Sequence, residues 1–220
     1  MSLKTELDAF RAEFMTKVPS EIRDAMTHAD QDLSDSGILN RAIKAGDRVP
    51  DFTLPDARGG NLRLSTLFEK GPVVLSFYRG GWCPYCNLEL RALQHTLPEF
   101  VRLGASLVAV SPQTPDESLS TAEKNELVFT VLSDTDSRIA KKFGIAFDLF
   151  EELRPIYAQF GHALPEKNGD DSWVLPIPAT FIIDQDGLVV FAFVDVDYRN
   201  RLEPTEIVTI LKALSTRHLA

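Results

Sequence analysis

Both cysteines of the chain lie in one short segment, where two residues separate Cys83 from Cys86. Residues three apart at a helix start lie close together, so their sulfurs can form a small disulfide ring and reopen it. A cysteine that attacks a substrate sulfur or a peroxide oxygen then has a partner that resolves the product. The spacing therefore predicts a reversible dithiol–disulfide pair.

The flanking residues place this pair on a strand-to-helix turn. The run 73–78 is of β type, and Pro84 suits the first turn of a helix. The helix is indicated by apolar residues at helical spacing, Leu88, Leu93, Leu97, Phe100 and Val101. Unpaired backbone N–H groups and the positive end of the helix dipole point at such a turn and favour thiolate. We therefore expect at least one cysteine to be reactive near neutral pH.

A Cys-x-x-Cys pair has other uses, which stay open at this point. Zinc usually takes four ligands, and the chain offers no third cysteine and four scattered histidines, His28, His95, His162 and His218. A purely structural disulfide fits poorly, because closing so short a loop removes little chain entropy. An unreactive pair is the third alternative. We expect a redox pair that needs no metal and no other cofactor.

Composition excludes several classes of partner. The chain has 220 residues, 44% of them hydrophobic, which is enough for one domain with an extension. A formal net charge of −9 disfavours binding to nucleic acid or to an anionic membrane surface. No apolar run approaches a membrane span, and residues 1–14 carry charges and no signal-peptide pattern. We expect a cytoplasmic protein, in which a cysteine pair is more often catalytic than structural.

Residues 1–45 are predicted to form a helical N-terminal extension. Apolar residues at spacings of three and four run through residues 2–18, and a second helix follows from Ser20, which can cap it. An apolar stripe does not name its partner. It packs either on its own domain or against a second copy in a homodimer.

Residues 46–220 are predicted to form the main domain. Alternation at 52–54 and 62–64 indicates a β-hairpin. Three strand-type runs, 73–78, 105–110 and 127–132, then alternate with helical patterns that reach about Leu103, Asn125 and Phe143. Such alternation implies a parallel sheet with helices on its faces. Pro98 should kink or break the first of these helices.

The signals in residues 148–176 are less clear than those before and after them. Residues 148–176 suit a helix interrupted by Pro155, followed by a polar loop at 167–172. A turn at Asp186-Gly187 predicts a hairpin between strands at 177–184 and 188–194. A final helix is expected over about 204–214.

In this order of elements, residues 46–215 resemble the thioredoxin-fold superfamily. They are most similar to its peroxiredoxin-like branch, the alkyl hydroperoxide reductase and thiol-specific antioxidant proteins. The resemblance implies an α/β, thioredoxin-like fold. It would have a central mixed β-sheet flanked by helices, an N-terminal β-hairpin and the helical extension.

Peroxiredoxins follow a Phe-Tyr strand end with Pro-x-x-x-Thr-x-x-Cys, often with a Glu three residues later. Laid over this chain, the pattern puts Arg79 at the Pro, Cys83 at the Thr, Cys86 at the peroxidatic cysteine and Glu89 at the Glu. The family's peroxide-binding Arg, in Arg-Ala-Thr-Phe, is replaced by Pro178. Arg79 either supplies the missing positive charge or is a solvated surface arginine.

The same segment also resembles thioredoxins, which have Trp-Cys-x-x-Cys and a cis-proline before a strand. Trp82 precedes the pair and Pro178 precedes the strand, while Cys-Pro-Tyr-Cys is typical of glutaredoxins. The resemblance implies a cis Pro178 that helps dock a substrate chain. The alternative is an ordinary strand-edge proline. Trp82 and Tyr85 would line the site or serve only in packing.

Together the motifs predict a thiol-dependent antioxidant oxidoreductase that reduces hydroperoxides or disulfides. Its reductant would be a thiol such as thioredoxin, glutaredoxin or glutathione. In the peroxidase version Cys86 attacks and Cys83 resolves, whereas in the disulfide version Cys83 attacks and Cys86 resolves. Two alternatives remain, a protein disulfide reductase without real peroxidase activity and a non-enzymatic redox-sensing domain.

Overall fold

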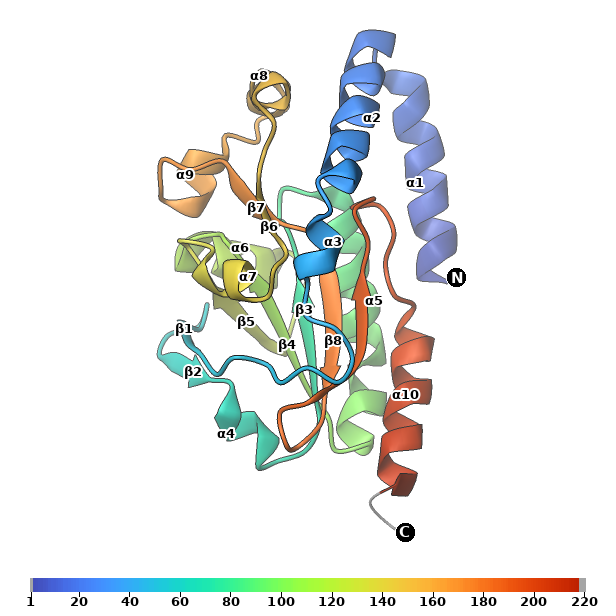
Figure 1. Cartoon of the computed structure of the whole chain (residues 1–220), viewed down its shortest axis with the longest axis vertical. Helices are drawn as coiled ribbons and strands as arrows, with labels where there is room; N and C mark the ends of the chain where they lie inside the picture. Colours follow the sequence, from blue (N-terminus) through green and yellow to red (C-terminus); the bar gives the residue numbers. More distant parts are fainter. Residues whose placement is uncertain (1, 218–220) are drawn as a thin grey trace.

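The computed structural model describes residues 2–217, and a five-stranded mixed sheet forms its centre (Figure 1). The strand order is β5-β4-β3-β8-β9. Strands β3 (Val73–Phe77), β4 (Ser106–Ser111) and β5 (Thr130–Ser133) are parallel to one another. Strand β8 (Ala179–Ile183) pairs antiparallel with β3, and β9 (Val189–Val194) pairs antiparallel with β8. The expected central mixed sheet is confirmed, and so is the hairpin that joins its last two strands.

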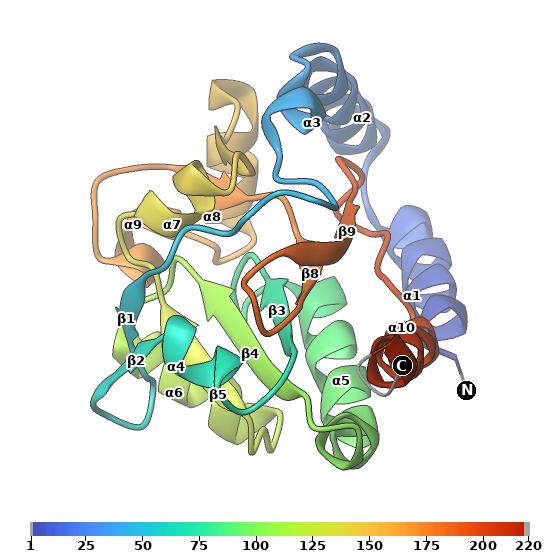
Figure 2. The ribbon, with the colours of Figure 1, turned by 60° about the horizontal axis from the view of Figure 1, so that its bottom comes forward.

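Each face of the sheet carries its own hydrophobic core, as the two-residue period of a strand requires. Val74 and its cross-strand partner Ile182 face one core, where helices α1, α5 and α10 lie together (Figure 2). Leu75 and its partner Phe181 face the other core, which also holds Phe143. All these side chains are buried, so the sheet is the rigid support from which the site is built.

The helices and the smaller strands complete the fold. The longer helices are α1 (Leu3–Lys17), α2 (Ser20–Asp35), α5 (Pro84–Arg102), α6 (Pro115–Lys124) and α10 (Pro204–Arg217). The shorter ones are α3 (Ile38–Arg41), α4 (Ser65–Phe68), α7 (Arg138–Lys142), η1 (Glu151–Leu153), α8 (Arg154–Gln159) and α9 (Leu164–Asn168). Two small hairpin sheets pair β1 (Thr53–Pro55) with β2 (Asn61–Arg63) and β6 (Ala146–Asp148) with β7 (Val174–Pro176). Within residues 2–217 no helix combines the length and apolarity that a membrane crossing needs.

Helix α5 runs unbroken past Pro98, so the expected break there is wrong. Pro98 is exposed and lies near the end of a helix held by buried residues such as Leu90, Leu93 and Phe100. Packing of this apolar face outweighs the missing N–H of the proline, since tertiary contacts routinely override helix propensity.

Residues 2–45 fold back onto the sheet domain. Leu3 and Leu7 of α1 join the core under α5, and Met26 and Ala29 of α2 join a separate cluster with Leu153. Figure 1 shows α2 reaching one end of the molecule, where it connects to α1. Helix α2 starts at Ser20, so the N-cap residue is Pro19 and the expected cap at Ser20 is wrong. No side chain within residues 2–217 caps this end of the helix with a hydrogen bond.

Segment 148–176 differs most from expectation. Strands β6 and β7 were not predicted, because each has three residues and pairs only with the other. Pro155 begins α8 instead of interrupting a longer helix, which suits a residue without a backbone donor. Part of the expected polar loop at 167–172 is helical, as the end of α9.

Candidate active site

Cys83 and Cys86 are both free and both buried at the start of α5. Cys83 is the N-cap of the helix, 1% exposed, and Cys86 lies in its first turn, 0% exposed. Strand β3 delivers the chain to this point and Pro84 starts the helix, as the sequence predicted. Among residues 2–217 no three His, Cys, Asp or Glu side chains gather in a metal-binding group.

The turn before Cys83 is packed tightly against α6. The N–H of Gly81 donates to the Gln113 side-chain oxygen at 2.7 Å, and Asn87 donates to the Gly81 carbonyl at 2.8 Å. A Cβ atom at Gly81 would lie 2.1 Å from the Thr121 hydroxyl oxygen, so this position tolerates only glycine without rearrangement. The backbone that carries Cys83 is therefore fixed from both sides.

Arg201 reaches Cys86 from the far end of the sequence. Its Nη2 lies 3.4 Å from the Cys86 sulfur, and its Nε donates to Glu89 Oε2 at 2.6 Å. Both side chains of this ion pair are buried. Cys86, Arg201 and Glu89 thus form one buried row, with Glu89 a single turn further along α5 than Cys86.

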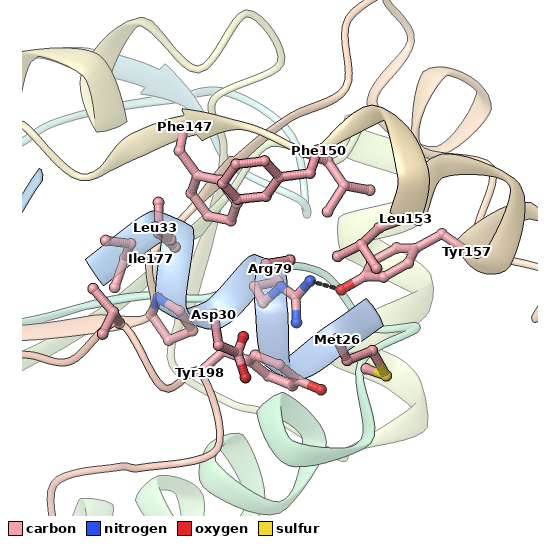
Figure 3. Close-up of a pocket in the computed structure, with 14 residues that line it drawn as sticks. Met26, Asp30, Leu33, Arg79, Phe147, Phe150, Leu153, Tyr157, Ile177 and Tyr198 are labelled. Carbon is pink, nitrogen blue, oxygen red and sulfur yellow. Dashed lines mark hydrogen bonds between the residues drawn. The ribbon is translucent and has the colours of Figure 1, made fainter. Parts of the chain in front are cut away.

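Arg79 lies on the other side of the cysteine pair, inside a ring of aromatic side chains. Its guanidinium carbon is 4.2 Å from the ring centre of Tyr198, 5.2 Å from that of Trp82 and 5.4 Å from that of Tyr157. It donates a hydrogen bond to the Tyr157 hydroxyl, drawn in Figure 3. Arg79 is 3% exposed, so the alternative of a solvated surface arginine is wrong.

The hydrogen bond between the two sulfurs and the nearby positive charges favour ionisation of Cys83 over Cys86. Burial alone raises the pKa of Cys83, but a hydrogen bond from the Cys86 thiol and the charges of Arg79 and Arg201 outweigh burial and lower this pKa to about 6. Burial and the Cys83 sulfur raise the pKa of Cys86 well above its usual value. The pair therefore shares one proton, held by Cys86, and Cys83 is the thiolate.

Glu89 responds to the same surroundings. Burial raises the pKa of Glu89 to about 7, while the Arg201 guanidinium opposes this shift. A carboxyl group that titrates near neutral pH can hold or accept a proton during catalysis. Glu89 contacts Arg201 rather than a sulfur, so it acts on the cysteines through the arginine.

A narrow pocket leads toward Arg79 between α2 and the segment that follows β6. Its lining includes Met26 and Asp30 of α2, Leu153, Tyr157 and Tyr198 (Figure 3). The internal volume is about 20 Å³, room for about one water molecule. Only a small molecule fits beside the guanidinium without movement of these side chains.

The structure places the remaining predicted residues around this centre. Trp82 and Tyr85 flank Cys83, and Pro178 lines the pocket beside Arg79. No peptide bond within residues 2–217 is cis, so the cis Pro178 implied by the thioredoxin resemblance is wrong. The adjoining strand β8 begins at Ala179 and is held on both sides by β3 and β9, so a trans proline fits at its start.

Three site residues were missed by the sequence reasoning, namely Tyr157, Tyr198 and Arg201. Arg201 is 115 residues from Cys86 in sequence. Tyr198 and Arg201 lie in a loop and Tyr157 in the short helix α8, and none of them is part of a motif, so only the fold brings these side chains to the site.

A family comparison agrees with this geometry. The model of the AhpC/TSA family matches residues 45–192. The chain belongs to the AhpC/TSA family. The matched segment contains both cysteines and starts where the helical extension ends, whereas Tyr198 and Arg201 lie beyond it.

Individual relatives of this AhpC/TSA protein are peroxiredoxins by name. Peroxiredoxin Bcp of Escherichia coli is 34% identical over 103 residues, 47% of this chain and 65% of the relative. The chloroplastic peroxiredoxin Q of Sedum lineare is 27% identical over 183 residues, 81% of this chain and 83% of the relative. The solved structure of peroxidoxin BcpB from Mycobacterium tuberculosis has a TM-score of 0.61 at 28% identity, covering 78% of this chain and 97% of that one.

Proposed function

We propose that this AhpC/TSA protein is a thiol peroxidase that reduces small hydroperoxides through a Cys83–Cys86 dithiol–disulfide cycle. The observation that carries the proposal is the burial of both thiols together with two buried guanidinium groups, Arg201 at 3.4 Å from the Cys86 sulfur and Arg79 near enough for its charge to lower the pKa of Cys83. Hydrogen peroxide needs far less room to reach a buried sulfur than a protein disulfide does, and regeneration by a thiol reductant then requires the cysteine turn to open. The arginines stabilise negative charge on the sulfur and on the departing oxygen.

In the proposed reaction the Cys83 thiolate attacks one oxygen of the hydroperoxide and the O–O bond breaks. Cys83 becomes a sulfenic acid, and the departing oxygen takes the proton of the Cys86 thiol to leave as water or an alcohol. The Cys86 thiolate then attacks the Cys83 sulfur, which forms the disulfide and expels hydroxide. Two electrons and two protons from a thiol reductant such as thioredoxin, glutaredoxin or glutathione restore both thiols.

The order of attack is part of the proposal. The motif comparison puts Cys86 at the peroxidatic position, while the charges of Arg79 and Arg201 favour Cys83 as the thiolate. We give more weight to the charges, because the thiolate is the form that attacks. Glu89 and Arg79 are assigned to charge control, and Trp82, Tyr85 and Pro178 to the walls of the substrate space.

Two single-cysteine variants test the cycle. Reduced Cys86→Ser should take up one oxygen atom per chain from hydrogen peroxide, seen by mass spectrometry as a trapped sulfenic acid. Reduced Cys83→Ser should react more slowly, because burial, the largest cause of the raised pKa of Cys86, remains in this variant. The reverse result would give the first attack to Cys86. Equal, full turnover in both variants would exclude a dithiol cycle.

A second candidate function is reduction of protein disulfides. The favouring observation is the low pKa of Cys83, the first cysteine of Trp-Cys-Pro-Tyr-Cys, which is the cysteine expected to attack in that chemistry. Reduced protein mixed with hydrogen peroxide, an organic hydroperoxide or a protein disulfide separates the two functions. We expect thiol loss to be fastest with hydrogen peroxide. Fastest loss with the protein disulfide would favour the second candidate.

A further inference from the structure

Of the three rings around Arg79, that of Tyr198 has its centre nearest to the guanidinium carbon. Tyr198 comes from the loop between β9 and α10, and its ring centre lies 4.2 Å from the guanidinium carbon. The same ring meets Tyr85 edge to face, with 5.6 Å between ring centres. Tyr198 therefore contacts both Arg79 and Tyr85, which lies two residues after Cys83.

A partly buried ion pair lies beside Tyr198. The guanidinium carbon of Arg199 is 5.1 Å from the Tyr198 ring centre, and its Nη2 is 2.5 Å from Asp30 Oδ2. Arg199 also pairs with Asp197 of its own loop. Asp30 belongs to α2, so the N-terminal helices connect to the cysteine turn through Arg199, Tyr198 and Arg79. Figure 3 shows Asp30 and Tyr198 next to each other below Arg79.

Arg79 depends on these neighbours for its position. Within residues 2–217 it makes no ion pair with a carboxylate, and its Nε has no hydrogen-bond partner. Its one side-chain hydrogen bond goes to Tyr157. A guanidinium with so few directional contacts is kept in place by the rings around it, because a cation over a ring face gains energy only at short range. Loss of the Tyr198 ring would let Arg79 move into the pocket and become hydrated.

We propose that Tyr198 is a positioning residue whose ring holds the Arg79 guanidinium near Cys83, and that the ion pair between Arg199 and Asp30 of α2 holds the ring. The inference rests on the proposed thiol function of Cys83. It gives the N-terminal helices, which lie outside the matched family segment, a part in the chemistry of the site.

The test is a titration of the Cys83 thiolate by ultraviolet absorbance in a Cys86→Ser background, without peroxide. In this background the ring exchange Tyr198→Leu should raise the apparent pKa of Cys83, and Tyr198→Phe should restore most of the original value. The peroxide reaction at neutral pH should slow about threefold to tenfold in Tyr198→Leu, the equivalent of one lost cation–ring contact. Asp30→Asn should shift the titration in the same direction by a smaller amount.

Arg11→Gln is the matched control. Arg11 of α1 pairs with Asp197 at 3.6 Å and thus joins the same helices to the same loop, but it does not hold Tyr198. It should leave the titration as in the parent. Folding is checked by thermal melting, and Asp30→Asn decides the matter if Tyr198→Leu does not fold. An unchanged titration in folded Tyr198→Leu, or in Asp30→Asn alone, would overturn the inference. Because no peroxide is used, failure of the proposed peroxidase function would appear separately, as absent turnover in the wild type.

Discussion

At the scale of single residues, the site is a balance of buried charges. Two guanidinium groups lie near the cysteine pair. Arg201 contacts the Cys86 sulfur, and Arg79 lies among aromatic side chains that include Tyr198. The anions opposite them are Glu89 and the thiolate of Cys83. Buried charges are tolerated only when they are paired or neutralised. We therefore expect the reactivity of Cys83 to depend on these buried charges as well as on its own sulfur.

Replacement of Arg201 should separate charge from packing. Arg201→Met should slow the reaction with hydrogen peroxide by about 10²-fold, since it removes one positive charge from the reacting sulfur pair. It also leaves the Glu89 carboxylate buried without its partner, which costs about 3–5 kcal/mol of stability. The reaction rate is measured by stopped-flow thiol loss, and stability by denaturant titration.

The double variant Arg201→Met/Glu89→Gln is the control for this experiment. It removes both charges, so it should recover much of the lost stability while the reaction stays slow. Recovery of the rate together with stability would mean that Arg201 serves only the fold.

The lowered pKa of Cys83 predicts how stability depends on pH. A group whose pKa is depressed by folding, here from 9.0 to about 6, stabilises the fold above its unfolded pKa and loses this contribution as pH falls through the folded value. The free energy of unfolding of the reduced protein should therefore rise between pH 6 and pH 9 relative to Cys83→Ser. The raised pKa of Glu89 acts in both proteins and cancels in the difference. Parallel pH profiles for the two proteins would contradict the charge balance described here.

At the scale of elements, helix α5 and the turn before it carry the site. The two prolines of the helix have opposite roles. Pro84 occupies the first position, where no N–H is needed, whereas Pro98 lies inside the helix and removes one backbone hydrogen bond. The turn at Gly81, which precedes the helix, packs against Thr121 of α6 and donates a hydrogen bond to Gln113.

Pro98→Ala should stabilise the protein. The position is exposed and the helix already continues through it, so alanine adds a backbone hydrogen bond without new contacts. We expect a gain of about 1–3 kcal/mol, seen as a melting temperature higher by several degrees. Pro84→Ala, at an equally exposed position in the same helix, should give no gain. A destabilised Pro98→Ala would mean that α5 needs the proline for its path.

Gly81→Ala should reduce both stability and activity. The added methyl group meets the Thr121 hydroxyl, so the turn must shift at a cost of about 1–3 kcal/mol. Because Cys83 is carried by the same turn, the reaction with peroxide should slow as well. Adding Thr121→Ala makes room for most of the methyl group and should restore part of both. A Gly81→Ala protein with wild-type stability and rate would show that the turn is less rigid than its contacts indicate.

The elements that the sequence predicted are those with local signals. The strand–turn–helix around Cys83 and Cys86 follows from apolar periodicity and Pro84, and the β8–β9 hairpin follows from Asp186-Gly187. Strands β6 and β7 escaped prediction because three-residue strands have no measurable period. The course of α5 past Pro98 was mispredicted because tertiary packing decided it.

The site was predictable to a similar degree. The spacing of Cys83 and Cys86 indicated the pair, and the resemblance to peroxiredoxins indicated Glu89. Arg201 and Tyr198 come from a loop between β9 and α10 and reach the cysteines only through the folded sheet. The sequence motif predicted which groups react, and the fold supplied the groups that control them.

At the scale of the whole molecule, three layers of chain converge on one buried centre. The sheet supplies the base, α5 the cysteines, and the N-terminal helices a cover that includes Met26 and Asp30. Together they leave Arg79 buried without a carboxylate of its own. The charge of Arg79 therefore contributes differently to the free energies of the reduced and the oxidised protein.

Disulfide formation removes the negative charge of Cys83 and leaves the Arg79 guanidinium without that anion. The oxidised state then carries the free-energy cost of a less balanced buried cation. A disulfide whose dithiol form is stabilised has a high reduction potential and is a ready electron acceptor. The reduced protein should therefore resist denaturant better than the oxidised protein, and Arg79→Met should narrow this gap and lower the potential measured against glutathione. An equal difference in stability between the reduced and oxidised forms of the wild type and of Arg79→Met would contradict this prediction. In these terms, the arginine proposed to promote the attack on peroxide would also supply part of the driving force that returns the protein to its reduced state.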